Sequence, residues 1–267
     1  MKNYKKFINS INENVNNMDK YNPMIDYTLL DNDASDEDII ELCEKAQDFG
    51  VKSVCVMPKH VSIAAEILAD SDVLVCTVIS FPEGVYTLEH KESETKETIK
   101  DGADEVDMVI NYKFLKKEWV DTDNDGDLPM EKFDILVEEI ESLVDICHEN
   151  DNKDGEPITL KVIVESGLLT EKQTIVATLA CLEAGADFIK TSTGKVPVGA
   201  EINKVKIMHD VIQDNPNLLS KNMKIKASGG VRDMNDITTF GQYVDRFGMG
   251  WQSVDTLNGL ETTGEGY

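Results

Sequence analysis

The stretches GADFIKTSTGK (Gly185–Lys195) and KIKASGGVR (Lys224–Arg232) decide the fold of this chain. Each is a short apolar run that leads directly into a glycine-bearing turn, as a buried parallel strand does before the loop that follows it. Each also holds one lysine, Lys190 or Lys226, in the middle of the run. Burying a lone ammonium group is costly, and two such groups brought together favour a neutral amine on one of them. Because a neutral amine attacks a carbonyl, the pair predicts Schiff-base chemistry.

Eight apolar, strand-like runs alternate with helix-period segments along the chain. The predicted strands are residues 24–30, 53–58, 73–80, 105–111, 158–166, 187–193, 223–229 and 244–250. Segments 35–50, 60–70, 130–150 and 170–185 have helical periodicity; Ser35 with Asp38 and Thr170 with Glu171 give helix starts, and Gly50 and Gly185 give helix ends. This alternation predicts an α/β fold, a (β/α)8 TIM barrel in a single domain over residues 24–260. An open doubly wound sheet is the alternative, but it usually shows GxGxxG after its first strand, and residues 28–35 have none.

The two ends of the chain and its composition limit the classes of function. Residues 1–23 form a polar leader that we expect to be helical, and residues 261–267 a mobile C-terminal tail. With 51 acidic against 26 basic residues in 267, the net charge is −25, which disfavours nucleic acids and anionic membranes as partners. No apolar run approaches the roughly 20 residues that cross a bilayer, and the N-terminus has no signal-peptide pattern. We therefore expect a cytoplasmic protein with small-molecule substrates.

Neither the cysteines nor the histidines show the spacing of a metal site. The five cysteines and four histidines are scattered, without CxxC or HExxH, so we expect reduced core cysteines, no metal and no cofactor. Residues 121–126 spell DxDxDG, the start of a calcium loop. Position twelve is Lys132 rather than glutamate, which favours a solvated acidic loop.

Strand alternation brings charged side chains to one axis. If the apolar neighbours of Lys190 and Lys226 face the helices, both lysines face the inside of the barrel. The same alternation turns further side chains inward on other strands, namely Asp26, Thr28, Cys55, Asp107 and Lys161 with Glu165. Barrel interiors usually hold branched apolar residues, so inward charges near carboxyl ends of strands predict an active site there. The alternative is that each charge reaches solvent at an edge.

Glycine-bearing loops follow the sixth and seventh strands and predict an anion site. STGK (192–195) and SGGVR (228–232) place backbone amides beside a lysine or an arginine. Late loops of this fold commonly bind phosphate. The substrate-binding residues expected here are Thr191, Gly194, Lys195, Gly229, Gly230 and Arg232, with Gly248 after the last strand.

These segments resemble those of deoxyribose-phosphate aldolases. The resemblance runs from residue 25 to the C-terminal region and includes SVCVMP (53–58), TVISFPEG (77–84), GADEVDMVIN (102–111), LKVIVESG (160–167) and the two lysine-bearing stretches. It implies a (β/α)8 barrel and a class I aldolase without metal. Such an enzyme cleaves 2-deoxy-D-ribose 5-phosphate reversibly to acetaldehyde and D-glyceraldehyde 3-phosphate.

The resemblance also implies roles for individual residues. Lys190 matches the Schiff-base lysine, and Lys226 the second lysine, which favours the neutral form of the first. Asp107 matches the carboxylate that moves protons, and Lys161 the lysine paired with it. The expected pocket-lining residues are Asp26, Thr28 and Cys55. Tyr267, the last residue, matches a tyrosine that some members carry on a mobile tail to move a proton.

One departure and several alternatives remain open. In FGMGWQS (247–253), Gly250 and Trp251 stand where family members usually carry phosphate-binding serines, which predicts a relaxed phosphate requirement. Another Schiff-base sugar-phosphate lyase or transaldolase is one alternative. A catalytically silent barrel that binds a phosphate ligand is another. A homodimer is plausible for the family.

Overall fold

Eight parallel strands close into a barrel in the computed structural model, which describes residues 18–119, 130–218 and 222–261. Each strand pairs with the next along the chain, and β8 returns to pair with β1. The strands are β1 (Ile25–Leu29), β2 (Ser53–Val56), β3 (Leu74–Ile79), β4 (Glu105–Val109), β5 (Thr159–Ile163), β6 (Phe188–Lys190), β7 (Lys224–Ser228) and β8 (Arg246–Gly250). The predicted (β/α)8 barrel is confirmed, and the open sheet is excluded.

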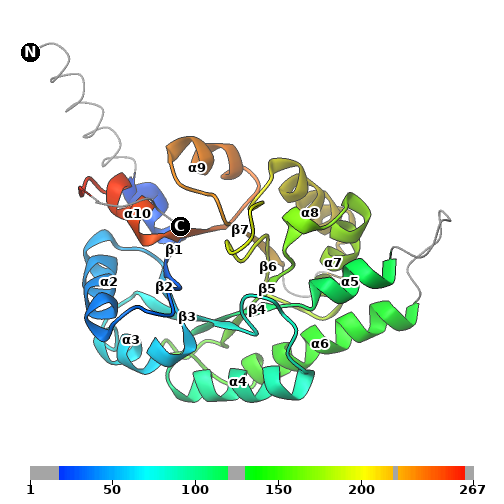
Figure 1. Cartoon of the computed structure of the whole chain (residues 1–267), viewed down its shortest axis with the longest axis horizontal. Helices are drawn as coiled ribbons and strands as arrows, with labels where there is room; N and C mark the ends of the chain where they lie inside the picture. Colours follow the sequence, from blue (N-terminus) through cyan, green and yellow to red (C-terminus); the bar gives the residue numbers. More distant parts are fainter. Residues whose placement is uncertain (1–17, 120–129, 219–221, 262–267) are drawn as a thin grey trace, which may run out of the picture.

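Helices surround the strands on all sides (Figure 1). They are α2 (Asp36–Phe49), α3 (Val61–Ile67), α4 (Leu88–Lys100), α5 (Tyr112–Trp119), α6 (Met130–His148), α7 (Glu171–Glu183), α8 (Ile202–Asp214), α9 (Met234–Phe240) and α10 (Trp251–Leu257). Short 3₁₀ turns η1 (Asn22–Met24), η2 (Pro58–His60) and η3 (Ser166–Leu168) precede β1 and follow β2 and β5. Among the described residues, no helix combines the length and apolar character that a bilayer crossing requires.

The predicted helix starts are confirmed by their capping geometry. Ser35 and Asp38 form a reciprocal capping box at the start of α2. Thr170 does the same at α7, with Gln173 as its partner. Gly50 ends α2 with φ of 66°, a left-handed conformation that a glycine adopts without a steric penalty.

The apolar core lies between the outer faces of the strands and the helices. Tyr27, Val54, Val106 and Ile189 are examples of fully buried side chains in this layer. The inside of the barrel is different, because its apolar side chains include only a small separate cluster of Leu30, Cys55, Cys76 and Val78, and Phe188 packs against Arg246. Buried charged side chains fill much of the remaining interior, and this unusual filling locates the site.

Residues 18–23, which belong to the predicted leader, pack against the barrel. Met18 is fully buried in the core, and the Asn22 side chain donates to the Phe49 carbonyl at 2.8 Å. Residues 1–17 of the predicted leader and 262–267 of the predicted tail lie outside the described residues. So does the acidic segment 121–126.

Candidate active site

Asp107 is the centre of the charged cluster inside the barrel. Alternation along β4 turns its carboxylate inward, where it is fully buried. Its Oδ2 accepts from Lys190 Nζ at 2.6 Å and from Lys226 Nζ at 2.7 Å, and its Oδ1 accepts from Lys161 Nζ at 2.9 Å. The two lysines of the opening sequence stretches therefore meet at one carboxylate oxygen, on neighbouring strands where Lys190 pairs with Lys226.

A second group of charges lies next to this cluster. Asp26 on β1 contacts Lys226 Nζ, accepts from Arg246 and accepts from Ser53 Oγ at 2.8 Å. Glu105, two residues before Asp107 on β4, accepts from both Arg246 amino groups at 3.1 and 3.3 Å and contacts Lys161 Nζ at 2.8 Å. The two groups form one connected network.

The network fixes the charges of its carboxylates. Burial alone would raise the pKa of Asp107, but Lys161, Lys190 and Lys226 hold it well below its usual range. The pKa of Asp26 is likewise lowered against the effect of burial, by Arg246, Lys226 and Lys161. The same balance of burial against its two cations lowers the pKa of Glu105.

Two of the three inner lysines, Lys161 and Lys226, are held as cations. Burial acts to lower the pKa of Lys226, but Asp107 and Asp26 raise it above its ordinary value. Asp107 and Glu105 do the same for Lys161 against its burial. Lys226 and Lys161 thus stay charged near neutral pH.

Of the three lysines, Lys190 is the one that lines the pocket at the barrel mouth. This pocket also contains Thr28 and Leu30 from β1 and its loop; its other lining residues are Thr193, Gly194, Ser228, Gly229, Gly230, Val231, Gly248 and Gly250. Lys190 is 3 % exposed, whereas Lys161 and Lys226 are fully buried. A ligand in the pocket would therefore meet Lys190, with Asp107 and Lys226 behind it.

Glycines let the loops after β6 and β7 pack backbone against backbone beside this pocket. Gly194, Gly229 and Gly230 have φ of 77°, 79° and 82°. A Cβ added at Gly199 would lie 2.0 Å from the Gly229 carbonyl oxygen, so a side chain there has no space. Gly194, Gly229 and Gly230 all line the pocket, so the predicted anion site and the pocket involve the same two loops.

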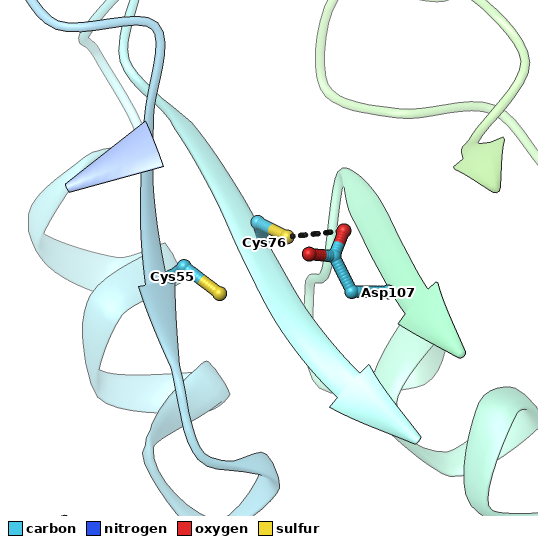
Figure 2. Close-up of side chains that lie close together, drawn as sticks. All are labelled: Cys55, Cys76 and Asp107. Atoms are coloured by element: carbon cyan, nitrogen blue, oxygen red, sulfur yellow. Dashed lines mark hydrogen bonds between the residues drawn. The ribbon is translucent and has the colours of Figure 1, made fainter. Parts of the chain in front are cut away.

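Cys55 and Cys76 face the axis beside Asp107 from neighbouring strands (Figure 2). The Cys76 thiol donates to Asp107 Oδ1 at 3.3 Å, and Lys161 Nζ lies 3.3 Å from its sulfur. Cys55, Cys76 and Asp107 have the spacing of a metal site, as do Asp26, Cys76 and Glu105. However, each of these carboxylates already accepts from lysine or arginine, so a divalent cation would have to displace ammonium or guanidinium groups. The donor set does not fit a resident metal.

Glu165 lies beyond the end of β5 rather than on its inward face. β5 ends at Ile163, and the chain turns at Glu165, whose φ is 52°. The side chain is fully buried and accepts from the amide and hydroxyl of Thr193. Glu165 thus holds the loop after β6, a role that strand alternation could not indicate.

The remaining predicted residues lie at different distances from the pocket. Thr191 is fully buried and exchanges hydrogen bonds with the Ser228 backbone at 2.9 and 3.0 Å. Lys195 is exposed, and its Nζ donates to the Leu30 carbonyl at 3.0 Å. Arg232 is exposed one residue beyond the pocket wall. Tyr267 lies outside the described residues.

Sequence reasoning missed Arg246, Glu105 and Cys76. Each carried a signal: Glu105 stands two residues before Asp107 and so shares its face, and Cys76 pairs with Cys55 across β2 and β3. Arg246 is one of two arginines in the chain and begins the last strand.

Comparison with known proteins agrees with this geometry. The profile of the DeoC/LacD family aldolases matches residues 23–246, which include every strand up to the start of β8. The chain belongs to this aldolase family. The predicted resemblance is confirmed, and the Schiff-base mechanism of class I aldolases is general in the family.

Similar proteins match over most of their own length. A deoxyribose-phosphate aldolase of Brevibacillus brevis is 40% identical over 94% of this chain and 100% of the relative. One of Staphylococcus carnosus is 41% identical over 81% of this chain and 86% of the relative. The crystal structure described as a putative deoxyribose-phosphate aldolase from Coccidioides immitis has a TM-score of 0.76 at 32% identity, covering 90% of this chain and 85% of that one. The deoxyribose phosphate aldolase from Aeropyrum pernix, described as tetrameric, has a TM-score of 0.72 at 25% identity, covering 92% and 94%.

Proposed function

We propose that this aldolase cleaves 2-deoxy-D-ribose 5-phosphate reversibly to acetaldehyde and D-glyceraldehyde 3-phosphate through a Schiff base on Lys190. The main support is the position of Lys190: it is the one inner lysine that lines the pocket, and its Nζ and that of Lys226 both donate to Asp107 Oδ2. The names of the relatives from Brevibacillus and Staphylococcus support this substrate.

The contacts suit each step of the reaction. The neutral amine of Lys190 attacks the sugar aldehyde, and loss of water from the carbinolamine leaves an iminium. The iminium takes up the electron pair of the bond between C2 and C3, which breaks when the C3 hydroxyl loses its proton and releases D-glyceraldehyde 3-phosphate. The enamine left on Lys190 then gains a proton at C2, and water hydrolyses the resulting iminium to acetaldehyde and the free amine. Asp107, within 2.6 Å of Lys190 Nζ, is placed to accept and return protons directly or through a water molecule. Lys226 and Lys161 stabilise the ionised form of Asp107, so that a proton it accepts is passed on again.

The glycine-bearing wall is where we place the phosphate. Gly194, Gly229 and Gly230 line the pocket, and Lys195 and Arg232 lie in the same two loops. Gly250 also lines the pocket but has no hydroxyl to donate. Trp251 instead packs on the other side of β1, with its ring centroid 5.7 Å from Lys45 Nζ. We therefore propose a relaxed phosphate requirement, tested by comparing kcat/KM for 2-deoxyribose with and without its phosphate; a preference as strong as in serine-bearing relatives would contradict it.

Reductive trapping tests the nucleophile directly. Borohydride added with limiting acetaldehyde should leave one ethyl group on Lys190, found by peptide mapping, and Lys190→Ala should lose both adduct and activity while keeping its melting temperature within a few degrees. Adducts spread over surface lysines, or absent, would favour the silent phosphate-binding barrel. Trapping on Lys190 with a different donor aldehyde or ketone, but not acetaldehyde, would favour another Schiff-base lyase or transaldolase.

A homodimer remains part of this proposal. The description of the Aeropyrum relative as tetrameric supports self-association in the family. Light scattering of the purified chain measures its mass; a monomer at micromolar concentration would contradict the homodimer, and a tetramer would correct it.

A further inference from the structure

Arg246 and Glu105 form a buried ion pair that does not belong to the pocket lining. Arg246 is 7 % exposed and Glu105 2 %, and neither lines the pocket that contains Lys190. The guanidinium is held by Asp26 on one side and Glu105 on the other, with its carbon 5.4 Å from the Phe188 ring centroid. Its charge and position are therefore fixed.

The connected network has one more positive group than negative groups. Arg246 joins Asp26, Asp26 joins Lys226, and Lys226 and Lys190 join Asp107. Glu105 joins the same network through Arg246 and Lys161. Within the groups joined by these ion contacts, four cations, Lys161, Lys190, Lys226 and Arg246, thus face three carboxylates, Asp26, Glu105 and Asp107. Among the residues that the structure describes, the buried Glu165 makes no ion contact with Lys190 and lies outside this set. A low-dielectric interior disfavours a surplus charge, so the network favours release of one proton.

Contact numbers indicate which group gives up that proton. A guanidinium stays protonated in proteins. Lys161 contacts Glu105 and Asp107 within 2.9 Å, and Lys226 contacts Asp26 and Asp107 within 2.7 Å. Among the described residues, Asp107 is the one carboxylate within 4.0 Å of Lys190. Deprotonating Lys190 therefore sacrifices the fewest ion contacts.

We infer that Arg246 and Glu105 are positioning residues that set the net charge of the barrel interior and thereby the pH at which Lys190 becomes a neutral nucleophile. This rests on the proposed function of Lys190. The effect acts at a distance, through Asp26, Lys226, Lys161 and Asp107. Two charges about 10 Å apart at an effective dielectric constant of about 20 interact enough to shift a titration by on the order of one pH unit.

Other titratable groups face Lys190 and must be considered with it. Asp107 on β4 contacts Lys190, Cys55 on β2 and Glu165 after β5 interact with it electrostatically, and Lys226 on β7 pairs with it. Asp26, Cys76 and Lys161 reach it through Asp107 and Lys226. All of them are retained in variants of Arg246 and Glu105. The difference between two such variants therefore reports on the charge of this pair.

The test compares three variants that remove one or both charges of the pair with one, R246K, that keeps them. In R246M the interior loses a positive charge, so the proton stays on Lys190 to higher pH. In a plot of kcat/KM against pH, the acid limb is the part where activity rises as Lys190 loses its proton. This limb should move to higher pH by on the order of one pH unit. In E105Q the surplus grows, and the limb should move down. In R246M/E105Q the original surplus returns, and the limb should return close to the parent value. R246K keeps the charge and should also keep the limb.

A structural role would not give opposite shifts. Lys91→Met provides the matched control, because Lys91 is a fully buried lysine paired with Glu139 outside the barrel axis; it should lower stability and leave the limb unchanged. If R246M fails to fold, R246Q carries the same expectation with amide donors left for Asp26. Limbs that move in the same direction in both single variants, or that do not move in folded variants, overturn the inference.

Competitive labelling separates this inference from the proposed function. Acetic anhydride acetylates only neutral amines, so the pH dependence of Lys190 acetylation, followed by mass spectrometry, reports its proton without requiring aldolase activity. Opposite shifts in labelling with an inactive parent enzyme would support the charge mechanism and refute the aldolase assignment. Trapping on Lys190 in the parent enzyme, with no shifts in labelling among the variants, would support the aldolase assignment and refute the charge mechanism.

Discussion

At the scale of single residues, Asp107 is the carboxylate that connects the three inner lysines. Its two oxygens accept from three lysines and one thiol, all within 3.3 Å. This many donors on one carboxylate keeps it ionised and fixes its orientation. A proton that it accepts during the reaction therefore leaves again readily, as a proton shuttle requires.

Gly248 controls the room that Lys226 needs. A Cβ at this position would lie 3.0 Å from Lys226 Cε and from both side-chain atoms of Ser228. We expect Gly248→Ala to displace Lys226 and lower kcat/KM by about tenfold, an activation cost of about 1.4 kcal/mol. Steady-state kinetics measure this. Gly155→Ala, where a Cβ would meet nothing within 4 Å, is the control and should affect stability alone; equal losses of activity in both would refute the steric account.

At the scale of elements, Lys91 connects two helices and a strand. From α4 it donates to the Val109 carbonyl at the end of β4 and to Glu139 of α6, both at 2.7 Å. Charged hydrogen bonds of this kind add to the apolar packing of α6, whose Ile140 and Leu143 are fully buried in the core.

Lys91→Met should lower the free energy of unfolding by about 2–4 kcal/mol, because Glu139 and the Val109 carbonyl lose a charged donor in a buried position. Urea unfolding monitored by circular dichroism measures the change. Lys96→Met, on the exposed side of the same helix, should stay within about 0.5 kcal/mol of the parent. Similar losses in the two variants would mean that the buried contacts contribute nothing specific.

The elements were also the scale at which sequence reasoning worked best. Alternation places Asp107, Lys161, Lys190 and Lys226 on one face of their strands, and the eight predicted runs contain all eight observed strands. It failed at Glu165, because a strand pattern cannot show that pairing ends at Ile163 and the chain turns. It missed Arg246 because the partners of an inward charge depend on register between β8 and its neighbours, which one strand does not contain.

At the scale of the whole molecule, the excess of acidic residues lies outside the ion-paired interior. The connected interior network has one more cation than carboxylates, whereas the chain as a whole has a net charge of −25. The excess acids therefore lie outside this network, where they repel one another through solvent that salt can screen.

The melting temperature should rise by at least about 3 °C between 10 mM and 500 mM NaCl, because screening reduces this repulsion while the buried pairs remain unscreened. Scanning calorimetry at neutral pH checks it. Sodium chloride is preferred to sulfate, which stabilises proteins by exclusion from their surface. A flat or falling melting temperature would mean that exposed ion pairs outweigh the repulsion.

The backbone contact between Gly199 and Gly229 has a consequence for directed evolution. A side chain has no space at Gly199, and at Gly229 it would be strained by a φ of 79°, so libraries that randomise these two positions would consist mostly of destabilised variants. Leu30 also lines the pocket, and it already carries a side chain that can be exchanged. New substrate ranges are therefore best sought on the β1 side, at Thr28 and Leu30, where selection can act on folded enzymes.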